Sequence, residues 1–421
     1  MKLQKILNHL QKLHPKEIDL SLDRILKLCK KLGNPQDKIK AISVVGTNGK
    51  QSTINALFSI LKEANFKCNV YTSPHIQKIN ERFIFNNKEL NDDELIELFE
   101  EVEKINDNNP LTFFEALSAC YFYKAAQYPD NINLIEAGLF HRFDATNILR
   151  NNLASIVCSI SKDHLDWLPK GQQTIEKIIF EKTSALLNSN IIVSKQNSKE
   201  TTECIKKTIS KNSSEKLFFN ENFSYLGGEN GFFYYEDKFG GLKLPLPNIL
   251  GQFQLENIST AIATLRHINL GIKDNDIKNG VTKIESIARL QEIKSGKLKA
   301  FVKNNRLLLD GSHNEDGSRV LNEYLQTLDC RKHVIIGMMA NKEHEKYISY
   351  FKDISSLTTI DIPNQPNAIS GKELKEKFKN IANVQFKESI QDAITSIPLK
   401  ENDLILITGS LYLSGEFLNL N

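Results

Sequence analysis

A strand, a glycine-bearing turn and a helix follow one another within residues 41–64, and this order limits the possible folds most. Ala41 to Val45 form a short run typical of a buried strand. The turn GTNGKQST (46–53) interrupts it, and apolar residues then recur at helical spacing as far as Ala64. A second strand-like run, 67–71, completes a βαβ unit, which predicts a parallel sheet with helices packed on its faces.

The same turn is suited to binding an anion. Glycines let backbone N–H groups converge, and the helix N-terminus adds partial positive charge. Lys50 adds a full charge, and Ser52 or Thr53 can face a phosphate or a metal ion. The general P-loop pattern is not met, because Val44 stands where it has glycine and Gln51 separates the lysine from the serine. We therefore predict a shortened phosphate-binding loop, the competing interpretation being an ordinary βα turn.

Composition excludes several classes of protein. The net charge is +3, from 54 basic and 51 acidic residues, which gives no electrostatic reason to expect nucleic acid or a membrane as partner. None of the six cysteines forms a CxxC pair, so neither a zinc site nor a disulfide framework is expected. The charged start of the chain has no apolar segment typical of a signal peptide, and no apolar run approaches a membrane span. We expect a cytoplasmic protein with reduced thiols.

The alternation of strands and helices is interrupted near residue 287, and 421 residues suggest roughly two or three domains. Before that point, we expect a P-loop-type parallel-sheet ATPase domain over 1–287, with a small β insert in the aromatic stretch 216–247. After it, a fresh alternation from 306–309 to 404–408 predicts a smaller Rossmann-like α/β domain over 288–421, about 130 residues and so of normal size.

Polar side chains follow three of the predicted strands. Ser73 comes after 67–71, Glu136 ends the run 133–135, and His164 comes after 153–160. Ligands collect at the carboxyl ends of parallel strands, and oxygen donors with one imidazole can hold Mg²⁺. Each residue alone is compatible with a structural role, but together they predict a metal site.

Two further residues stay open on residue type alone. Asp310 follows the run 307–309 and could hold a ribose hydroxyl or cap the next helix. Lys182 follows Glu181 within a predicted helix, where a solvated face or an ion pair is the ordinary interpretation.

The turn GTNGKQST resembles the GTNGKGS loop of Mur-type amide ligases, specifically the folylpolyglutamate synthase and dihydrofolate synthase branch. Further segments resemble motifs of that family in the same order and over nearly the whole chain: YTSPHI (71–76), TFFEA (112–116), Glu136 to Asn147, DHLDWL (163–168), FEK (180–182), Gly251 with Gln254 and Asn257, Arg289 to Gln291, DGSHN (310–314) and TGSLY (408–412).

The resemblance implies roles for particular residues. ATP would be bound by Gly46, Thr47, Asn48, Gly49, Lys50, Gln51, Ser52, Asn257, Arg289, Asp310 and His313. Mg²⁺ would be held by Ser73, Glu136 and His164, and the catalytic set would be Lys50, His164, Lys182 and Arg289, with Lys182 carbamylated. A pteroate site would be lined by Leu20, Ser21, Leu22, Thr112, Phe113, Phe114, Glu115, Phe143, Asp144 and Ala145.

The implied activity is ATP-dependent ligation of L-glutamate to dihydropteroate, to reduced folates, or to both, through an acyl phosphate and by a monomeric enzyme. One alternative is a diverged, non-catalytic nucleotide-binding protein, which Gln51 and the pair Phe140-His141, in place of glycines, support. Another alternative is a Mur ligase acting on a different carboxylate. The small number of residues ahead of Gly46 argues against this alternative.

Overall fold

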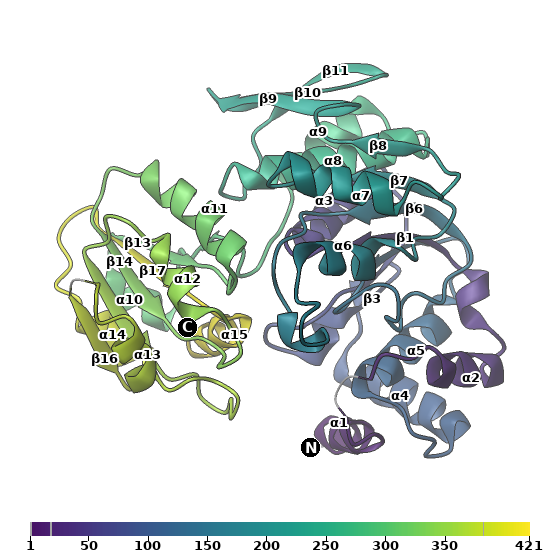
Figure 1. Ribbon diagram of the computed structural model, residues 1–421, viewed down its shortest axis with the longest axis horizontal. Helices are drawn as coiled ribbons and strands as arrows, with labels where there is room; N and C mark the ends of the chain where they lie inside the picture. Colours follow the sequence, from purple (N-terminus) through teal and green to yellow (C-terminus); the bar gives the residue numbers. More distant parts are fainter. Residues whose placement is uncertain (1, 17–18, 382) are drawn as a thin grey trace. The chain divides into compact units, whose positions relative to one another are not determined.

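The computed structural model describes residues 2–16, 19–381 and 383–421, which form two compact α/β units (Figure 1). Unit 1 comprises the chain up to His164 together with Leu168–Pro247 and Leu255–Ile284. Unit 2 comprises Leu165–Trp167, Asn248–Gln254 and Glu285–Asn421. The predicted α/β class is confirmed, since each unit is built on a sheet that is largely parallel.

Unit 1 contains an eight-stranded sheet in the order β4-β3-β2-β5-β1-β6-β7-β8. Its strands are β1 (Lys40–Val45), β2 (Cys68–Tyr71), β3 (Phe83–Phe85), β4 (Lys88–Glu89), β5 (Ile132–Glu136), β6 (Asn152–Val157), β7 (Asn190–Val193) and β8 (Lys216–Phe218). The strands from β2 to β8 in this order pair in parallel, whereas β3 and β4 form an antiparallel edge. Because β1 lies between β5 and β6, the turn that follows it emerges at the middle of the sheet.

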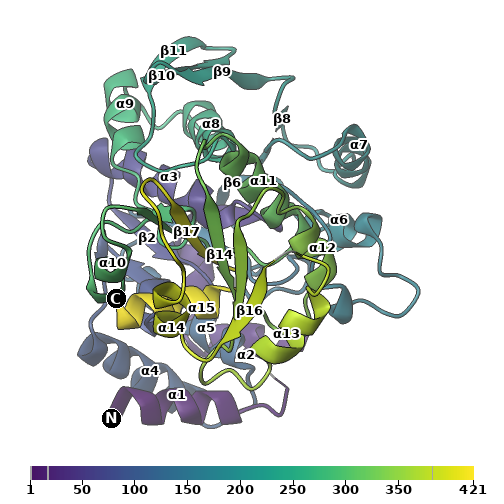
Figure 2. The same cartoon turned by 90° about the vertical axis from the view of Figure 1, so that its left-hand side faces the viewer.

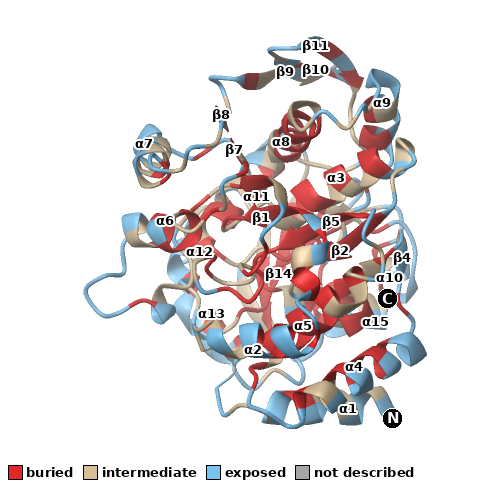
Figure 3. Ribbon diagram, turned by 90° about the vertical axis from the view of Figure 1, so that its right-hand side faces the viewer, coloured by how far each residue is buried: buried red, intermediate tan, exposed pale blue. Residues whose placement is uncertain are grey.

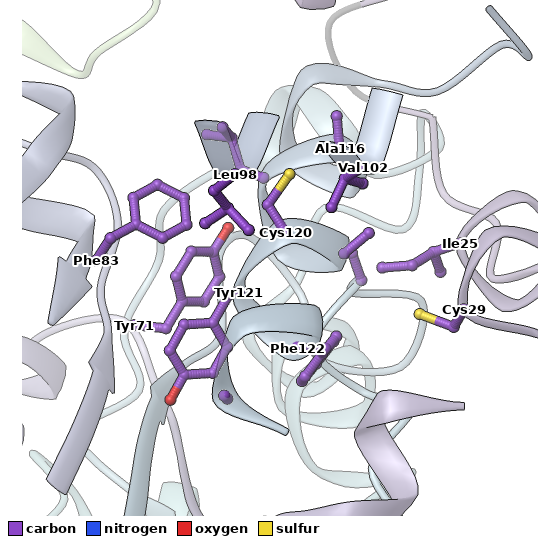
Figure 4. Packing of buried hydrophobic residues seen from close by; sticks show 14 of the residues in the cluster. Ile25, Cys29, Tyr71, Phe83, Leu98, Val102, Ala116, Cys120, Tyr121 and Phe122 are labelled. Carbon is purple, nitrogen blue, oxygen red and sulfur yellow. The ribbon is translucent and has the colours of Figure 1, made fainter. Parts of the chain in front are cut away.

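Helices cover this sheet and build its core. They are α1 (Lys2–Lys12), α2 (Asp23–Lys31), α3 (Lys50–Glu63), α4 (Asp92–Asn106), α5 (Phe113–Ala125), α6 (Ile175–Thr183), α7 (Lys199–Thr208), α8 (Phe253–His267) and α9 (Asp274–Thr282), with short 3-10 turns at Pro35–Lys38, Ile79–Arg82 and Leu165–Trp167. Among helices α1, α2, α4 and α5, helix α5 has the largest share of buried residues (Figure 3). Its Tyr121 stacks on Tyr71 of β2 at 4.9 Å between ring centroids, beside Phe83 and Leu98 (Figure 4).

The stretch 216–247 divides between two sheets. Strands β9 (Phe223–Glu229), β10 (Phe232–Asp237) and β11 (Gly240–Pro245) form the small antiparallel sheet expected there. The first residues of the stretch instead form β8, which pairs in parallel with β7 at the edge of the main sheet.

Unit 2 contains a six-stranded sheet in the order β12-β13-β17-β14-β15-β16, parallel except for β12. Figure 2 shows its strands β14, β16 and β17. Its strands are β12 (Gln291–Glu292), β13 (Arg306–Leu309), β14 (Lys332–Ile336), β15 (Ser356–Ile360), β16 (Val384–Lys387) and β17 (Leu404–Thr408). Its helices are α10 (Lys297–Val302), α11 (Glu315–Gln326), α12 (His344–Ser349), α13 (Gly371–Lys377), α14 (Ile390–Thr395) and α15 (Leu411–Leu420).

Within residues 2–16, 19–381 and 383–421, every helix is too short or too polar to cross a bilayer. The cytoplasmic location, the monomeric state and the lack of a nucleic-acid partner stay predictions from the sequence.

Candidate functional site

The predicted phosphate loop is a tight turn between β1 and α3. Gly46 and Gly49 adopt φ values of 146° and 88°, which L side chains rarely tolerate. A Cβ on Gly46 would lie 2.8 Å from the Cβ of Cys158, and one on Gly49 would lie 2.5 Å from Oδ1 of Asn257. Both glycines are therefore required by close packing, and Asn257 lies directly against the loop.

The loop is fastened to the segment that follows β6. The backbone N–H groups of Thr47 and Asn48 donate to the carbonyl of Ser159 at 2.8 and 3.1 Å, and the Thr47 hydroxyl donates to the carbonyl of Ser161. The first bond within α3 runs from Thr53 N–H to the Gly49 carbonyl, so the three preceding N–H groups, including that of Gln51, point out of the helix end. This end of α3 is an anion-binding geometry.

Lys50, Ser73 and Glu136 lie together beside the loop. The Lys50 Nζ is 3.2 Å from the Thr47 carbonyl and 3.7 Å from Oε1 of Glu136. The Ser73 N–H donates to Oε2 of Glu136 at 3.2 Å. Pairing between parallel strands explains this arrangement, because Val44 of β1 is in register with Glu136 of β5 and the end of β2 lies alongside. Of the three residues that the strand-end reasoning placed beside the loop, Ser73 and Glu136 lie there in contact with each other.

His164 follows the segment that fastens the loop. Its backbone has a φ of 56°, its N–H donates to Oδ1 of Asp163, and its Nε2 lies 3.7 Å from Oδ2 of the same carboxylate. No group of three or more His, Cys, Asp or Glu side chains suited to a metal occurs among residues 2–16, 19–381 and 383–421. The predicted set is of another kind, because one of its three ligands is the Ser73 hydroxyl. The buried Glu136 carboxylate beside Ser73 is chemically suited to a hard divalent cation. The three ligands stay a prediction.

Lys182 is not the solvated lysine that residue type alone favoured. It is 3% exposed, and its Nζ donates to the carbonyls of Gly46 at 2.9 Å and Leu139 at 2.7 Å. The ion pairs belong to its neighbour Glu181, which accepts from Arg142 at 2.8 Å and lies 2.9 Å from Lys177. Burial, with a further contribution from the charge of Lys50, lowers the pKa of Lys182 to about 7. A large fraction of its amine is therefore uncharged and nucleophilic near neutral pH.

Arg24, which the sequence reasoning missed, joins two segments of the predicted pteroate site. Its Nε donates to Oε2 of Glu115 at 3.0 Å, and its Nη1 donates to Asp19 at 2.8 Å. Glu115 also closes a capping box with Thr112 at the start of α5. Residues 20–22, just ahead of α2, are thereby held near 112–115. An arginine beside a predicted substrate segment, with acidic residues at 19 and 115, was the available signal.

The third segment of the predicted pteroate site, residues 143–145, contacts the second, residues 112–115, through Gly138. A Cβ on Gly138 would lie 3.1 Å from both the Phe114 ring and Oδ2 of Asp144. Asp144 is buried and accepts from the N–H groups of Gly138 and Thr146 at 2.9 Å each, and its burial raises the pKa of the carboxyl. Phe143 is 37% exposed, with the Arg142 guanidinium 4.3 Å from its ring centroid. All the predicted pteroate residues lie in unit 1, including Phe113, Ala145, the exposed Leu20 and the partly buried Ser21 and Leu22.

The remaining predicted residues lie in unit 2. Asp310 accepts from the N–H groups of Leu290 at 2.7 Å and Ser312 at 2.9 Å, so it fixes the segment that carries Arg289. The helix-capping role considered for this cluster belongs to Asn314, whose Oδ1 accepts from Gly317 N–H at the start of α11. His313 lies in the same turn, with its Nδ1 3.0 Å from the Gly311 carbonyl.

Comparison with known proteins agrees with these features. Residues 297–411 match the family model "Mur ligase, glutamate ligase domain". Dihydrofolate synthase/folylpolyglutamate synthase of Haemophilus influenzae is 29% identical, covering 98% of this chain and 95% of its own length. The protein of the same name from Bacillus subtilis is 28% identical over 93% of this chain and 92% of its own.

Solved structures agree as well. Escherichia coli FolC in complex with DHPP and ADP is 26% identical, with a TM-score of 0.88 over 99% of this chain and 97% of that chain. Folylpolyglutamate synthase of Mycobacterium tuberculosis, complexed with ADP and AMPPCP, has the same fold at 22% identity and a TM-score of 0.85, over 100% of this chain and 98% of that chain. The chain thus shares the two-unit fold of these ligases, and its residues 297–411 match the Mur ligase, glutamate ligase domain. Over nearly its whole length the chain is similar to proteins named dihydrofolate synthase/folylpolyglutamate synthase, which confirms the resemblance.

Proposed function

We propose that the protein is an ATP-dependent ligase that joins L-glutamate to dihydropteroate, to reduced folates, or to both, in folate biosynthesis. The choice of these substrates is supported by the names of the similar proteins. The observation that carries the proposal is the loop itself, in which Lys50 stands at the N-terminus of α3 and 3.7 Å from the buried Glu136.

The first step is activation of a carboxylate, which is a poor electrophile. The N–H groups at the start of α3 and the Lys50 ammonium hold the phosphates of ATP, and Lys50 stabilises charge on the γ-phosphoryl group. A carboxylate oxygen of the pterin substrate forms a bond to the γ-phosphorus while the bond to ADP breaks. A Mg²⁺ ion held by Ser73, Glu136 and His164 would supply further charge neutralisation at the phosphates.

The second step forms the amide. The glutamate amine attacks the acyl carbon, the bond to phosphate breaks, and the amine loses a proton. The acyl phosphate reacts with water unless water is excluded, so the apolar side chains of the pteroate segments, such as Phe114 and Phe143, have a protective as well as a binding role.

Lys182 enters this proposal as a carbamate. Its uncharged amine would attack CO₂, forming an N–C bond and releasing a proton, so that the buried cation becomes an anion. The lowered pKa, caused by burial first, supports this, since only the uncharged amine reacts. The nearby Lys50 charge, which disfavours a protonated Lys182, would attract the anion.

The test is ADP release by the purified protein with ATP, Mg²⁺ and L-glutamate, with dihydropteroate in one reaction and tetrahydrofolate in another. We expect ADP and a glutamyl product in equal amounts with at least one pterin, and little ADP when glutamate is omitted. ATP binding without ADP release in either reaction would contradict the proposal and favour a non-catalytic nucleotide-binding protein.

A further inference from the structure

The loop from Leu139 to Arg142 is fastened along the end of α6 that carries Lys182. The Lys182 Nζ donates to the Leu139 carbonyl at 2.7 Å and lies 5.5 Å from the centroid of the Phe140 ring. One residue beyond His141, the Arg142 N–H donates to the Glu181 carbonyl at 3.0 Å, and the Arg142 guanidinium pairs with the Glu181 carboxylate. His141 is therefore held between two points of contact with residues 181–182.

The His141 side chain is buried and incompletely satisfied. It is 3% exposed, and its Nδ1 is buried with no hydrogen-bond partner. Buried nitrogens without partners are uncommon and call for an explanation. Burial, together with the charge of Lys182, lowers the pKa of His141 to about 4, so the ring is neutral near neutral pH. A neutral imidazole offers one N–H donor and one acceptor nitrogen.

A carbamate on Lys182 changes what its surroundings must provide. The ammonium of the unmodified lysine is matched by two acceptors, the carbonyls of Gly46 and Leu139. A carbamate keeps a single N–H and gains two oxygens that share one negative charge. These oxygens need hydrogen-bond donors, whereas the Lys182 amine contacts carbonyl groups and the Phe140 ring. An imidazole N–H is a donor of the required kind.

We propose that His141 is a positioning residue that donates a hydrogen bond to an oxygen of the carbamate formed on Lys182, while Phe140 shields that group from water. The inference rests on the carbamylation of Lys182 proposed above. The pair Phe140-His141 stands where the family pattern has two glycines, so this chain adds to the site two side chains that the pattern lacks.

The experiment measures the carbamate directly, on the full chain. The protein is titrated with ¹³C-bicarbonate and the carbamate carbon is followed by NMR, with Lys182→Met to assign the signal. His141→Leu and His141→Asn form a matched pair with the same number and branching of side-chain heavy atoms, of which only the second keeps an N–H donor. Because a hydrogen bond to a charged group is lost, we expect His141→Leu to raise the bicarbonate concentration for half occupancy about tenfold or more, and His141→Asn to restore part of the affinity.

Each outcome of this experiment either supports or overturns the inference. A carbamate signal of equal affinity in the wild type and both variants overturns the role of His141 alone. A wild type without the signal overturns carbamylation and this inference together, while the ADP assay tests ligation separately. Should the variants fail to fold, as melting curves would reveal, the ¹⁵N shifts of His141 in the wild type decide: we expect them to change as the carbamate forms, and unchanged shifts overturn the inference.

Discussion

We propose that phosphate binding depends most on Lys50. Lys50→Ala removes a full positive charge at the start of α3 and should lower kcat/KM for ADP release by roughly 10²- to 10³-fold, the loss typical of one electrostatic donor at a reacting group. The fold should persist, because the Lys50 ammonium contacts the Thr47 carbonyl and the Glu136 carboxylate at the loop. The control is Lys62→Ala, an exposed lysine in the last turn of the same helix. Wild-type turnover in Lys50→Ala would move the phosphate site elsewhere.

Lys182 gives a second residue-scale prediction through its pKa. The pKa is lowered to about 7, mainly by burial, so the amine becomes uncharged as pH rises through 7 rather than through the ordinary lysine range. Carbamate formation itself releases a proton, so at a fixed concentration of dissolved CO₂ the signal should rise with pH. Because the amine loses its charge near neutrality, the signal should already rise between about pH 6 and 8. The measurement is ¹³C NMR across that range. A signal that appears only near the ordinary pKa of lysine would contradict the burial-induced shift.

The sequence allowed part of this site to be predicted. Ser73 and Glu136 were placed beside Lys50 because the carboxyl ends of adjacent parallel strands meet at one edge. The burial of Lys182 could not be deduced from residue type, since Glu181-Lys182 reads as an exposed charge pair and only the packed turn at Gly46 and Leu139 encloses the amine. Arg24 was missed because its partner Glu115 is distant in sequence.

Helix α3 is positioned by a close contact with α9. A Cβ on Gly280 would lie 2.6 Å from Cα of Ile60, and the Ser59 hydroxyl donates to the Gly280 carbonyl at 2.7 Å. Gly280→Ala should therefore lower the free energy of unfolding by roughly 1–3 kcal/mol through overpacking, despite the better helix propensity of alanine. The contact is with backbone, which cannot move without displacing α3.

Urea unfolding followed by circular dichroism measures this effect. The matched control is Asn279→Ala, an exposed neighbour in α9 that should change stability little. A Gly280→Ala protein as stable as the control would show that the two helices separate at no cost.

Strong local signals explain which elements were predictable. The buried runs of β1, β5, β13 and β17 were found, because a short apolar run bounded by turn residues is a direct strand signal. Strand β8 was assigned to the small insert, since alternation within a segment does not tell which partner strand it pairs with. Helix α4 was passed over although its capping box at Asn91 and Glu94 is present in the sequence.

At the scale of the whole molecule, the division into two units is only partly a property of local sequence. In the structure, the last change from unit 1 to unit 2 falls between Ile284 and Glu285. The sequence analysis placed the domain boundary between 287 and 288, where the alternation of strands and helices is interrupted. Segments 165–167 and 248–254 belong to unit 2 although most of the chain around them belongs to unit 1. Such membership depends on long-range packing, which periodicity and composition do not report.

Buried histidines make the stability of the whole chain depend on pH. Burial first, then the Lys182 charge, lowers the pKa of His141 to about 4, whereas in the unfolded chain it titrates near 6.5. Between these values the unfolded chain binds more protons, so the free energy of unfolding falls as pH falls, by at most about 1.4 kcal/mol per pH unit from this group. Burial also lowers the pKa of His333 and His344, so other histidines add to the slope.

The variant His141→Asn isolates the contribution of His141. At pH 7 the variant should be less stable, because a smaller side chain leaves the buried site underfilled. The difference in stability should shrink as pH falls from 6.5 toward 4. Only the wild type loses stability over this range through His141, because the imidazole binds a proton more readily in the unfolded chain than in the folded one. Urea unfolding curves at intervals of half a pH unit give the two slopes. Parallel slopes would mean that His141 is protonated in the folded chain as readily as in the unfolded one, and would remove the electrostatic basis for placing it beside the Lys182 amine.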